Sequence, residues 1–186
     1  MSKISSIHVA ICAVLAACSL SAHSAPETLA NNGHTYEWIS GPFSWDQALA
    51  DASTHTNAGQ TGYMATITSA AENDFVHGLA NTRLAWIGAS QVNGDWVWRA
   101  GPEAGQALSY SNWGTNQGLN QSLETHAGIN WFGQTQKRWD DFGVVVQTFG
   151  YVVEYDAVTA VPEPETYAMM LAGLGALSLV ARRRVR

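Results

Sequence analysis

The sequence predicts a single α+β domain between two targeting segments, and three observations support this prediction. Helical spacing of apolar residues dominates the chain up to Ala80, and strand patterns dominate after that residue. A short apolar run also lies near each end of the chain, outside the stretch that carries the helix and strand patterns. With 186 residues, 46% of them hydrophobic, the chain can form one packed domain in addition to the end segments.

The N-terminal residues 1–24 are typical of a secretory signal peptide. A lysine at the third position precedes an apolar run over residues 7–17, and small residues follow over residues 19–25. This order predicts cleavage before Ala25. The stretch that ends at Cys18 also resembles a lipobox, which would give a lipidated N-terminus. Ordinary cleavage is favoured because a second hydrophobic segment is present at the C-terminus.

Both cysteines of the chain, Cys12 and Cys18, lie in this leader. Its removal leaves a domain without a disulfide, a cysteine metal site or a cysteine nucleophile. An exported domain of this kind must be stabilised without covalent cross-links.

Two helices are predicted in the first half of the domain. Ser44 is a suitable N-cap, and apolar residues follow it at positions 45, 48, 49 and 52, on one helical face. Further along, Ser69-Ala70-Ala71-Glu72 has the form of a capping box, and apolar residues follow at positions 75, 76 and 79.

The second half of the domain has the pattern of strands. Residues 85–89 form a short apolar run, and Asn93-Gly94 is a strong signal for a two-residue hairpin. Residues 144–146 and the alternating stretch 150–155 are predicted as closing strands. Residues 109–136 are rich in small polar residues, which predicts much loop, and long loops in compact domains are often functional.

All eight tryptophans lie between residues 38 and 139. Each needs an apolar environment and a polar partner for its N–H group, so most are expected in the core. The charge of the domain excludes one class of partner. Residues 26–161 contain four basic and thirteen acidic side chains, a net charge of −9, so no nucleic acid partner is expected. An acidic surface is compatible with cations, neutral sugars or solubility.

The C-terminal segment has three parts in a fixed order. Residues 157–165 form a linker that contains Pro162-Glu163-Pro164, residues 166–181 carry no charge, and residues 182–186 form an Arg-rich tail. As a helix, the uncharged part reaches about 24 Å, slightly short of a ~30 Å hydrocarbon core. This predicts a short transmembrane helix with the tail in the cytoplasm and the domain outside. The order resembles the PEP-CTERM sorting signal of Gram-negative bacteria, which implies processing by an exosortase.

Motifs in the domain resemble those of C-type lectin-like domains, in order and over nearly its whole length. The matching segments are residues 63–73, 85–89, 94–98, 110–113, 139–141 and 150–155. The resemblance implies a C-type lectin-like fold over residues 33–156, with two helices packed on antiparallel sheets and a long loop region. The usual disulfides of the family are missing, which resembles its cysteine-free bacterial branch.

The resemblance also implies a calcium site. Sugar-binding members hold calcium through an acidic or amide pair that flanks a cis-proline, a later Glu and a pair of polar residues after a tryptophan. The ion then binds two sugar hydroxyls. Calcium takes 6–8 oxygen ligands, which suits such a set. The candidate ligands are Gln117, Glu124, Asp140, Asp141 and, after a one-residue shift, Asn120.

Two positions depart from the family pattern. Gly118 replaces the proline, and Leu119, which cannot coordinate a cation, stands at the second loop position of an ungapped alignment. A cis bond without proline costs ~3 kcal/mol, so a different loop geometry is expected. Each candidate also has a plain alternative: an exposed loop carboxylate for Glu124, turn residues for the two aspartates, and ordinary loop amides for the others.

These observations predict a non-enzymatic, calcium-assisted carbohydrate-binding protein, exported to the cell surface or the exopolysaccharide matrix. The expected partners are a carbohydrate or extracellular polysaccharide, an exosortase-type enzyme, and the membrane through the C-terminal helix before processing. The alternative is a structural or adhesion protein of the matrix that does not bind sugar. A hydrolase that uses Asp140 and Glu124 has no support beyond the presence of acids, and no zinc, phosphate-loop or serine-hydrolase motif is present.

Overall fold

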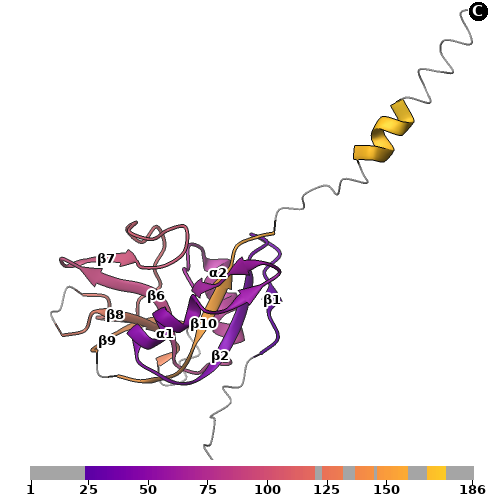
Figure 1. Cartoon of the computed structure of the whole chain (residues 1–186). Helices are drawn as coiled ribbons and strands as arrows, with labels where there is room; N and C mark the ends of the chain where they lie inside the picture. Colours follow the sequence, from indigo (N-terminus) through magenta and orange to yellow (C-terminus); the bar gives the residue numbers. More distant parts are fainter. Residues whose placement is uncertain (1–23, 120–122, 132–136, 145, 159–166, 175–186) are drawn as a thin grey trace, which may run out of the picture.

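This computed structural model describes residues 24–119, 123–131, 137–144, 146–158 and 167–174 (Figure 1). Within these residues the domain contains strands and two helices in an α+β arrangement, as the sequence predicts. The elements are β1 (Glu27–Thr28), β2 (Thr35–Phe43), α1 (Trp45–Ala52), β3 (Thr56–Asn57), β4 (Gln60–Thr61), β5 (Tyr63–Met64), α2 (Ala70–Leu79), β6 (Ala85–Val92), β7 (Asp95–Trp98), β8 (His126–Ile129), β9 (Trp139–Phe142) and β10 (Thr148–Tyr155).

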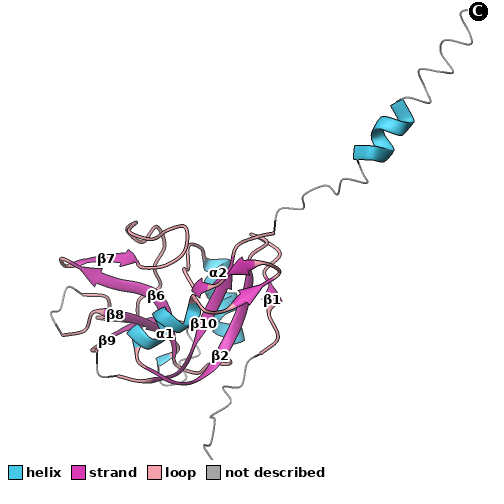
Figure 2. Ribbon diagram, viewed as in Figure 1, coloured by secondary structure: helices cyan, strands magenta, loops and turns pink. Residues whose placement is uncertain are grey.

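The main sheet has the strand order β1-β2-β10-β6-β8-β9, with β5 paired to β10 and β7 paired to β6 (Figure 2). The last strand therefore pairs with β2 near the start of the domain, which brings the two ends of the domain together. Most pairs are antiparallel, but β10 and β6 are parallel. The sheet is thus mixed, and β1 and β9 stand at the two ends of its strand order.

Hydrophobic side chains cover both faces of the central strand β6. Trp86 belongs to one buried cluster and its neighbour Ile87 to the other, because successive side chains of a strand point to opposite faces. Helix α1 packs on the cluster of Trp86, and helix α2 packs on the cluster of Ile87. Burial on both sides explains why residues 85–89 form an unbroken apolar run.

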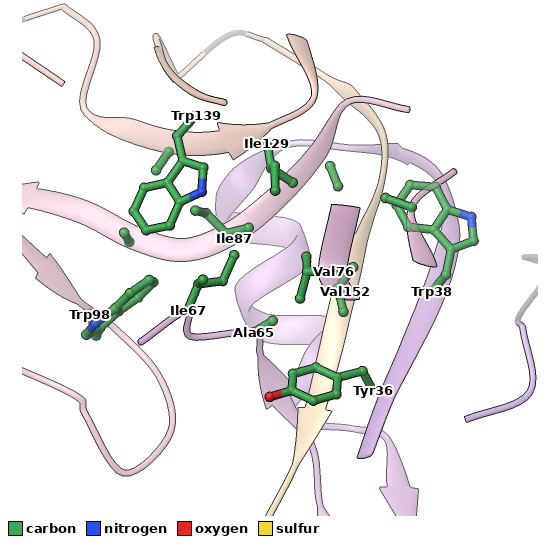
Figure 3. Packing of buried hydrophobic residues seen from close by; sticks show 14 residues of the cluster. Tyr36, Trp38, Ala65, Ile67, Val76, Ile87, Trp98, Ile129, Trp139 and Val152 are labelled. Atoms are coloured by element: carbon green, nitrogen blue, oxygen red, sulfur yellow. The ribbon is translucent and has the colours of Figure 1, made fainter. Parts of the chain in front are cut away.

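Five tryptophans are buried and three are half-buried, so the prediction of a largely structural role is confirmed. Figure 3 shows part of one cluster, with Tyr36 and Trp38 at one end and Trp98 and Trp139 at the other. The Trp139 Nε1 atom donates to Asn73 Oδ1 at 2.6 Å. Within the described part of the chain, the N–H groups of Trp38 and Trp98 have no hydrogen-bond partner, which departs from the expectation that each indole finds one.

Both helices begin at the predicted caps. Ser44 accepts from the Gln47 amide, and the Gln47 side chain accepts from the Ser44 amide, which makes a complete capping box. At α2 the box is only half formed. The Ser69 hydroxyl accepts from the Glu72 amide, but the Glu72 carboxylate accepts from the Thr68 amide at 2.7 Å rather than from the Ser69 amide. A buried hydrogen-bond network, described below, holds this carboxylate.

The hairpin at Asn93-Gly94 is confirmed, with positive φ at both residues and β6 paired to β7. The predicted strand at residues 144–146 is wrong at its two described positions, 144 and 146, which do not lie in a strand. Val144 is 63% exposed, and the Val146 amide closes a turn onto Gly143 O at 3.2 Å. The strand in this part of the chain is β9, which ends at Phe142, before the predicted segment. Strand β2 was not predicted, because Gly41 and Pro42 interrupt its pattern.

Residues 167–174, within the predicted transmembrane segment, are helical with exposed side chains. In the part of the chain that is described, no helix has the length and apolar character needed to cross a bilayer. The predicted signal peptide, the Pro-Glu-Pro motif and the Arg-rich tail lie outside the described residues, apart from residue 24.

Candidate functional site

The segment after Trp113 is fixed in place by two tryptophans and two short backbone contacts. The Trp113 ring packs edge-on against Trp139 at 5.5 Å and tilted against Trp96 at 4.6 Å. The Gly114 amide donates to Trp139 O at 2.8 Å, and the Trp139 amide donates to Asn112 O at 2.9 Å. The loop therefore runs beside the start of β9, where the two candidate aspartates lie.

The hairpin β6–β7 holds the far side of the same loop. The Trp96 Nε1 atom donates to Gly118 O at 3.0 Å, and the Gln91 side chain donates to Leu119 O at 2.7 Å. Gly118 has a φ of +72°, and a Cβ at this position would overlap the Trp113 ring. Proline cannot adopt this φ, so the prediction of a different loop geometry is consistent with the conformation found here.

Asp141 has one satisfied and one unsatisfied carboxylate oxygen. It lies in β9 opposite Ala127 and is 2% exposed. Its Oδ1 atom accepts from the Gly118 amide at 3.0 Å, whereas its buried Oδ2 atom has no hydrogen-bond partner among the described residues. A buried carboxylate oxygen without a donor is costly, and a bound cation is one way to compensate it.

Asp140, in β9, pairs with Gly128 of β8 and lines a cleft of about 240 Å³. The other residues of this cleft are Gly114, Thr115, Gln117, Trp131, Arg138 and Trp139. Burial raises the pKa of Asp140 to about 6. The negative charges of Asp141 and Glu124 act in the same direction, against a hydrogen bond from the Asp141 backbone. Burial and the two neighbouring acids therefore disfavour the ionised form of Asp140.

The structure brings several candidate ligands together but not into one tight group. Gln117 and Asp140 share the cleft, Asp141 binds the amide next to Gln117, and half-buried Glu124 acts electrostatically on Asp140. The carboxylates of Glu124, Asp140 and Asp141 are not among the described groups whose ligand atoms all lie within 4.8 Å of one another. Asn120 lies outside the described residues.

A group that does meet this distance was not predicted: His34, Glu72 and Glu154. Glu72 accepts from Tyr36, Asn32 and Thr68, and Glu154 accepts from His34, Tyr36 and Thr66. Because every carboxylate oxygen of this group already accepts from at least one donor, its arrangement suits a hydrogen-bonded network that joins three segments. An acid within the apolar alternation of residues 150–155 was the available signal for it.

The protein-family model described as the lectin C-type domain matches residues 42–143, which is more than half of the chain. The chain belongs to the C-type lectin domain family. The family model thus covers the stretch from the end of β2 to the residue after β9, including the loop and both aspartates. Residues 160–184 match the PEP-CTERM protein-sorting motif, which indicates an exported protein.

Relatives of the lectin domain come from distant organisms. Halomucin from Haloquadratum walsbyi is 36% identical over 145 residues, covering 72% of this chain and 2% of halomucin. Lectin BRA-3 from Megabalanus rosa is 28% identical over 113 residues, covering 59% of this chain and 64% of BRA-3. The chain thus spans less than two thirds of either relative.

Among solved structures, the cow C-type carbohydrate-recognition domain of CD23, in the presence of a GlcNAc2Man3 oligosaccharide, superimposes with a TM-score of 0.56. It shares 25% sequence identity with this chain, and the match covers 68% of this chain and 91% of the CD23 domain. The C-type lectin-like fold predicted from the sequence motifs is therefore confirmed.

The residues present are compatible with calcium in their chemistry. The buried Asp141 Oδ2 atom accepts no hydrogen bond from the described residues, and the raised pKa of Asp140 reflects burial beside two other acids. The hard carboxylate oxygens of these residues are the ligand type that calcium prefers. Leu119 adds no side-chain ligand and is 51% exposed, so the set is smaller than the family pattern implies.

Proposed function

We propose that this protein is an exported, calcium-assisted carbohydrate-binding module of the cell surface or the exopolysaccharide matrix. The observation that carries the proposal is the buried Oδ2 atom of Asp141, which has no hydrogen-bond partner among the described residues and belongs to the residue that follows Asp140 in β9. Glu124, Asp140 and Asp141 are the proposed acidic ligands, with Gln117 and Asn120 as further candidates.

Calcium would supply positive charge and coordination positions for sugar hydroxyls. The chain supplies the surroundings. Trp113 and Trp139 hold the loop, the Gly118 amide orients Asp141, and Trp131 forms one wall of the cleft. The family of the domain, the name of BRA-3 and the oligosaccharide in the CD23 structure support a sugar as the ligand class. No catalytic residue is proposed.

Sorting follows from the C-terminal motif. We infer that an exosortase-type enzyme processes the chain near Pro162-Glu163-Pro164, and that the uncharged segment 166–181 holds the protein in the membrane before this step. The domain then lies outside the cytoplasm, where an exposed sugar-binding cleft has access to polysaccharide.

A thermal melt tests the calcium part of the proposal. Calcium that binds the native state raises the unfolding midpoint by mass action, by RT ln(1 + [L]/Kd) in free energy. The midpoint of the purified protein at millimolar calcium should exceed the midpoint in chelator. Equal midpoints would exclude the calcium site. A glycan array with calcium present then tests the sugar part.

A second candidate function is adhesion without sugar binding. It is favoured by Leu119 at a ligand position and by the exposed side chains of Leu123 and Val144, which are 81% and 63% exposed. Exposed apolar residues of this kind suit a protein partner. A blank glycan array, together with capture of a defined matrix protein, would favour this function over the first.

A further inference from the structure

Arg138 contributes a positive charge to the cleft and forms no ion pair with a described carboxylate. It lines the cleft with Trp131 and Asp140. Its Nη1 atom donates to Asn112 Oδ1 at 2.9 Å and to Trp113 O at 3.3 Å, and both acceptors are neutral. Among the described residues the ion pairs are His34–Glu154, His55–Asp51 and Lys137–Asp74, so no described carboxylate pairs with Arg138.

The neighbouring residue shows the contrast. Lys137 Nζ lies 2.8 Å from Asp74 Oδ1, so its charge is compensated at the surface. The two hydrogen bonds of Arg138 hold the guanidinium in place but leave its other N–H groups available. Within residues 26–161, whose net charge is −9, such a positioned arginine in a cleft favours an anionic group on the ligand.

The other walls of the cleft suit a small polar ring. Its volume of about 240 Å³ is below the ~300–1,000 Å³ of pockets for drug-sized ligands, which is consistent with a single sugar unit. Thr115 and Gln117 offer hydrogen-bonding groups, and half-buried Trp131 offers an aromatic surface.

We propose that the cleft selects a saccharide unit that carries a carboxylate, a uronate, and that Arg138 binds this carboxylate. The inference rests on the proposed carbohydrate-binding function and specifies its ligand class. A guanidinium matches a carboxylate with two parallel N–H···O bonds, which discriminates the acid from a neutral sugar. The Trp131 ring and the loop side chains contact the sugar itself.

Asp140 lies in the same cleft and repels an anionic ligand when it is ionised. A cation held by Asp140 and its neighbouring acids removes this repulsion. Binding of the uronate is therefore expected to depend on calcium more strongly than binding of a neutral analogue.

Isothermal titration of the purified protein at millimolar calcium tests the proposal, with digalacturonate and its dimethyl ester as probes. The two ligands share the rings and hydroxyls and differ in charge. We expect the acid to bind about tenfold more tightly than the ester, as one charge-assisted pair of hydrogen bonds predicts. In Arg138→Gln the acid and the ester should bind with about equal affinity, and Arg138→Lys should retain part of the preference for the acid.

Arg83→Gln is the matched control, because Arg83 is exposed, lies outside the cleft and should leave the preference intact. Melts without ligand establish that each variant is folded. Equal affinity for acid and ester in the wild-type protein, or an unchanged preference in Arg138→Gln, overturns the uronate proposal and leaves the carbohydrate-binding function standing. Failure of acid, ester and every glycan on the array to bind overturns both.

Discussion

His34 Nδ1 lies 2.6 Å from Glu154 Oε1, and this contact joins the start of β2 to the end of β10. Glu154 is 1% exposed, and Tyr36 and Thr66 also donate to it. Tyr36 in turn donates to Glu72 of α2 at 2.9 Å. The network thus connects both ends of the domain to a helix, in a protein whose domain lacks cysteine.

The first prediction concerns this contact and pH. Its hydrogen bond raises the pKa of His34, and burial raises the pKa of Glu154, so the folded protein holds protons here more tightly than the unfolded chain. For His34 this stability is fully present below the ordinary histidine pKa of ~6.5 and is lost as the pH rises through the raised value. The stability that Glu154 contributes also decreases as the pH rises, because the pKa of Glu154 is raised in the folded protein.

His34→Gln is therefore expected to lower the free energy of unfolding by about 1.5–3 kcal/mol at pH 6 and by less at pH 9. Urea denaturation at both pH values measures the difference. The control is His77→Gln, because the ring of His77 contacts the neutral amide of Asn130 rather than a carboxylate. A cost for His34→Gln that is equal or larger at pH 9 would contradict the assignment.

The second prediction concerns Asp141. Asp141→Asn keeps an acceptor for the Gly118 amide but removes the negative charge. In chelator its free energy of unfolding should stay within about 1 kcal/mol of the wild type, because the hydrogen bond is retained. Its calcium-dependent rise in melting midpoint should be lost. Asp74→Asn, which changes an exposed acid elsewhere, should retain the rise.

The third prediction concerns Gly118, where the family pattern has proline. Gly118→Pro is expected to lower stability by about 3 kcal/mol or more, because proline cannot adopt a φ of +72° and has no N–H to donate to Asp141. Gly118→Ala should also destabilise, since its Cβ would overlap Trp113. Gly105→Ala is the control: its φ is +82°, but nothing lies within 4 Å of the added Cβ.

For both Gly118 variants the measurement is a chemical denaturation series. The substitution at Gly105 should cost only the ~1 kcal/mol of a left-handed backbone position. Restored stability or stronger calcium binding in Gly118→Pro would show that the loop adopts the geometry of the family pattern instead.

The fourth prediction concerns sorting. Alanine substitution of Pro162, Glu163 and Pro164 together is expected to abolish delivery to the cell surface, because these residues form the motif within the matched segment. Cell fractionation and surface labelling measure the distribution, with Val158→Ala as the control in the same linker. Surface display of the triple variant at the wild-type level would refute a role of the motif.

Local signals in the sequence predicted the elements that depend on neighbouring residues. The Ser44 cap, the Asn93-Gly94 hairpin and the alternation of residues 150–155 each correspond to an observed element. These patterns succeed because a cap, a tight turn and a two-residue period involve only a few adjacent residues. The prediction of a strand at the three valines 144–146 failed because apolar composition alone does not determine strand pairing.

The site could be predicted only in part. The resemblance identified Asp140 and Asp141 as a pair of ligands, but it did not predict that the two side chains have different environments. In the structure Asp140 lines the cleft, while Asp141 is buried against the Gly118 amide. The cleft residues Trp131 and Arg138, and the network around Glu154, were not singled out, since their partners lie far away in the chain.

The sequence by itself determined the α+β class, the family, the starts of both helices and the sorting motif, because each of these depends on short patterns of residue type. Only the tertiary structure decided which charges are compensated. It left Asp141 Oδ2 and Arg138 without partners of opposite charge among the described residues, and it satisfied Glu154 through segments from both ends of the domain. The physical reason is that electrostatic compensation depends on distance in space, and distance in space is set by how the strands pair.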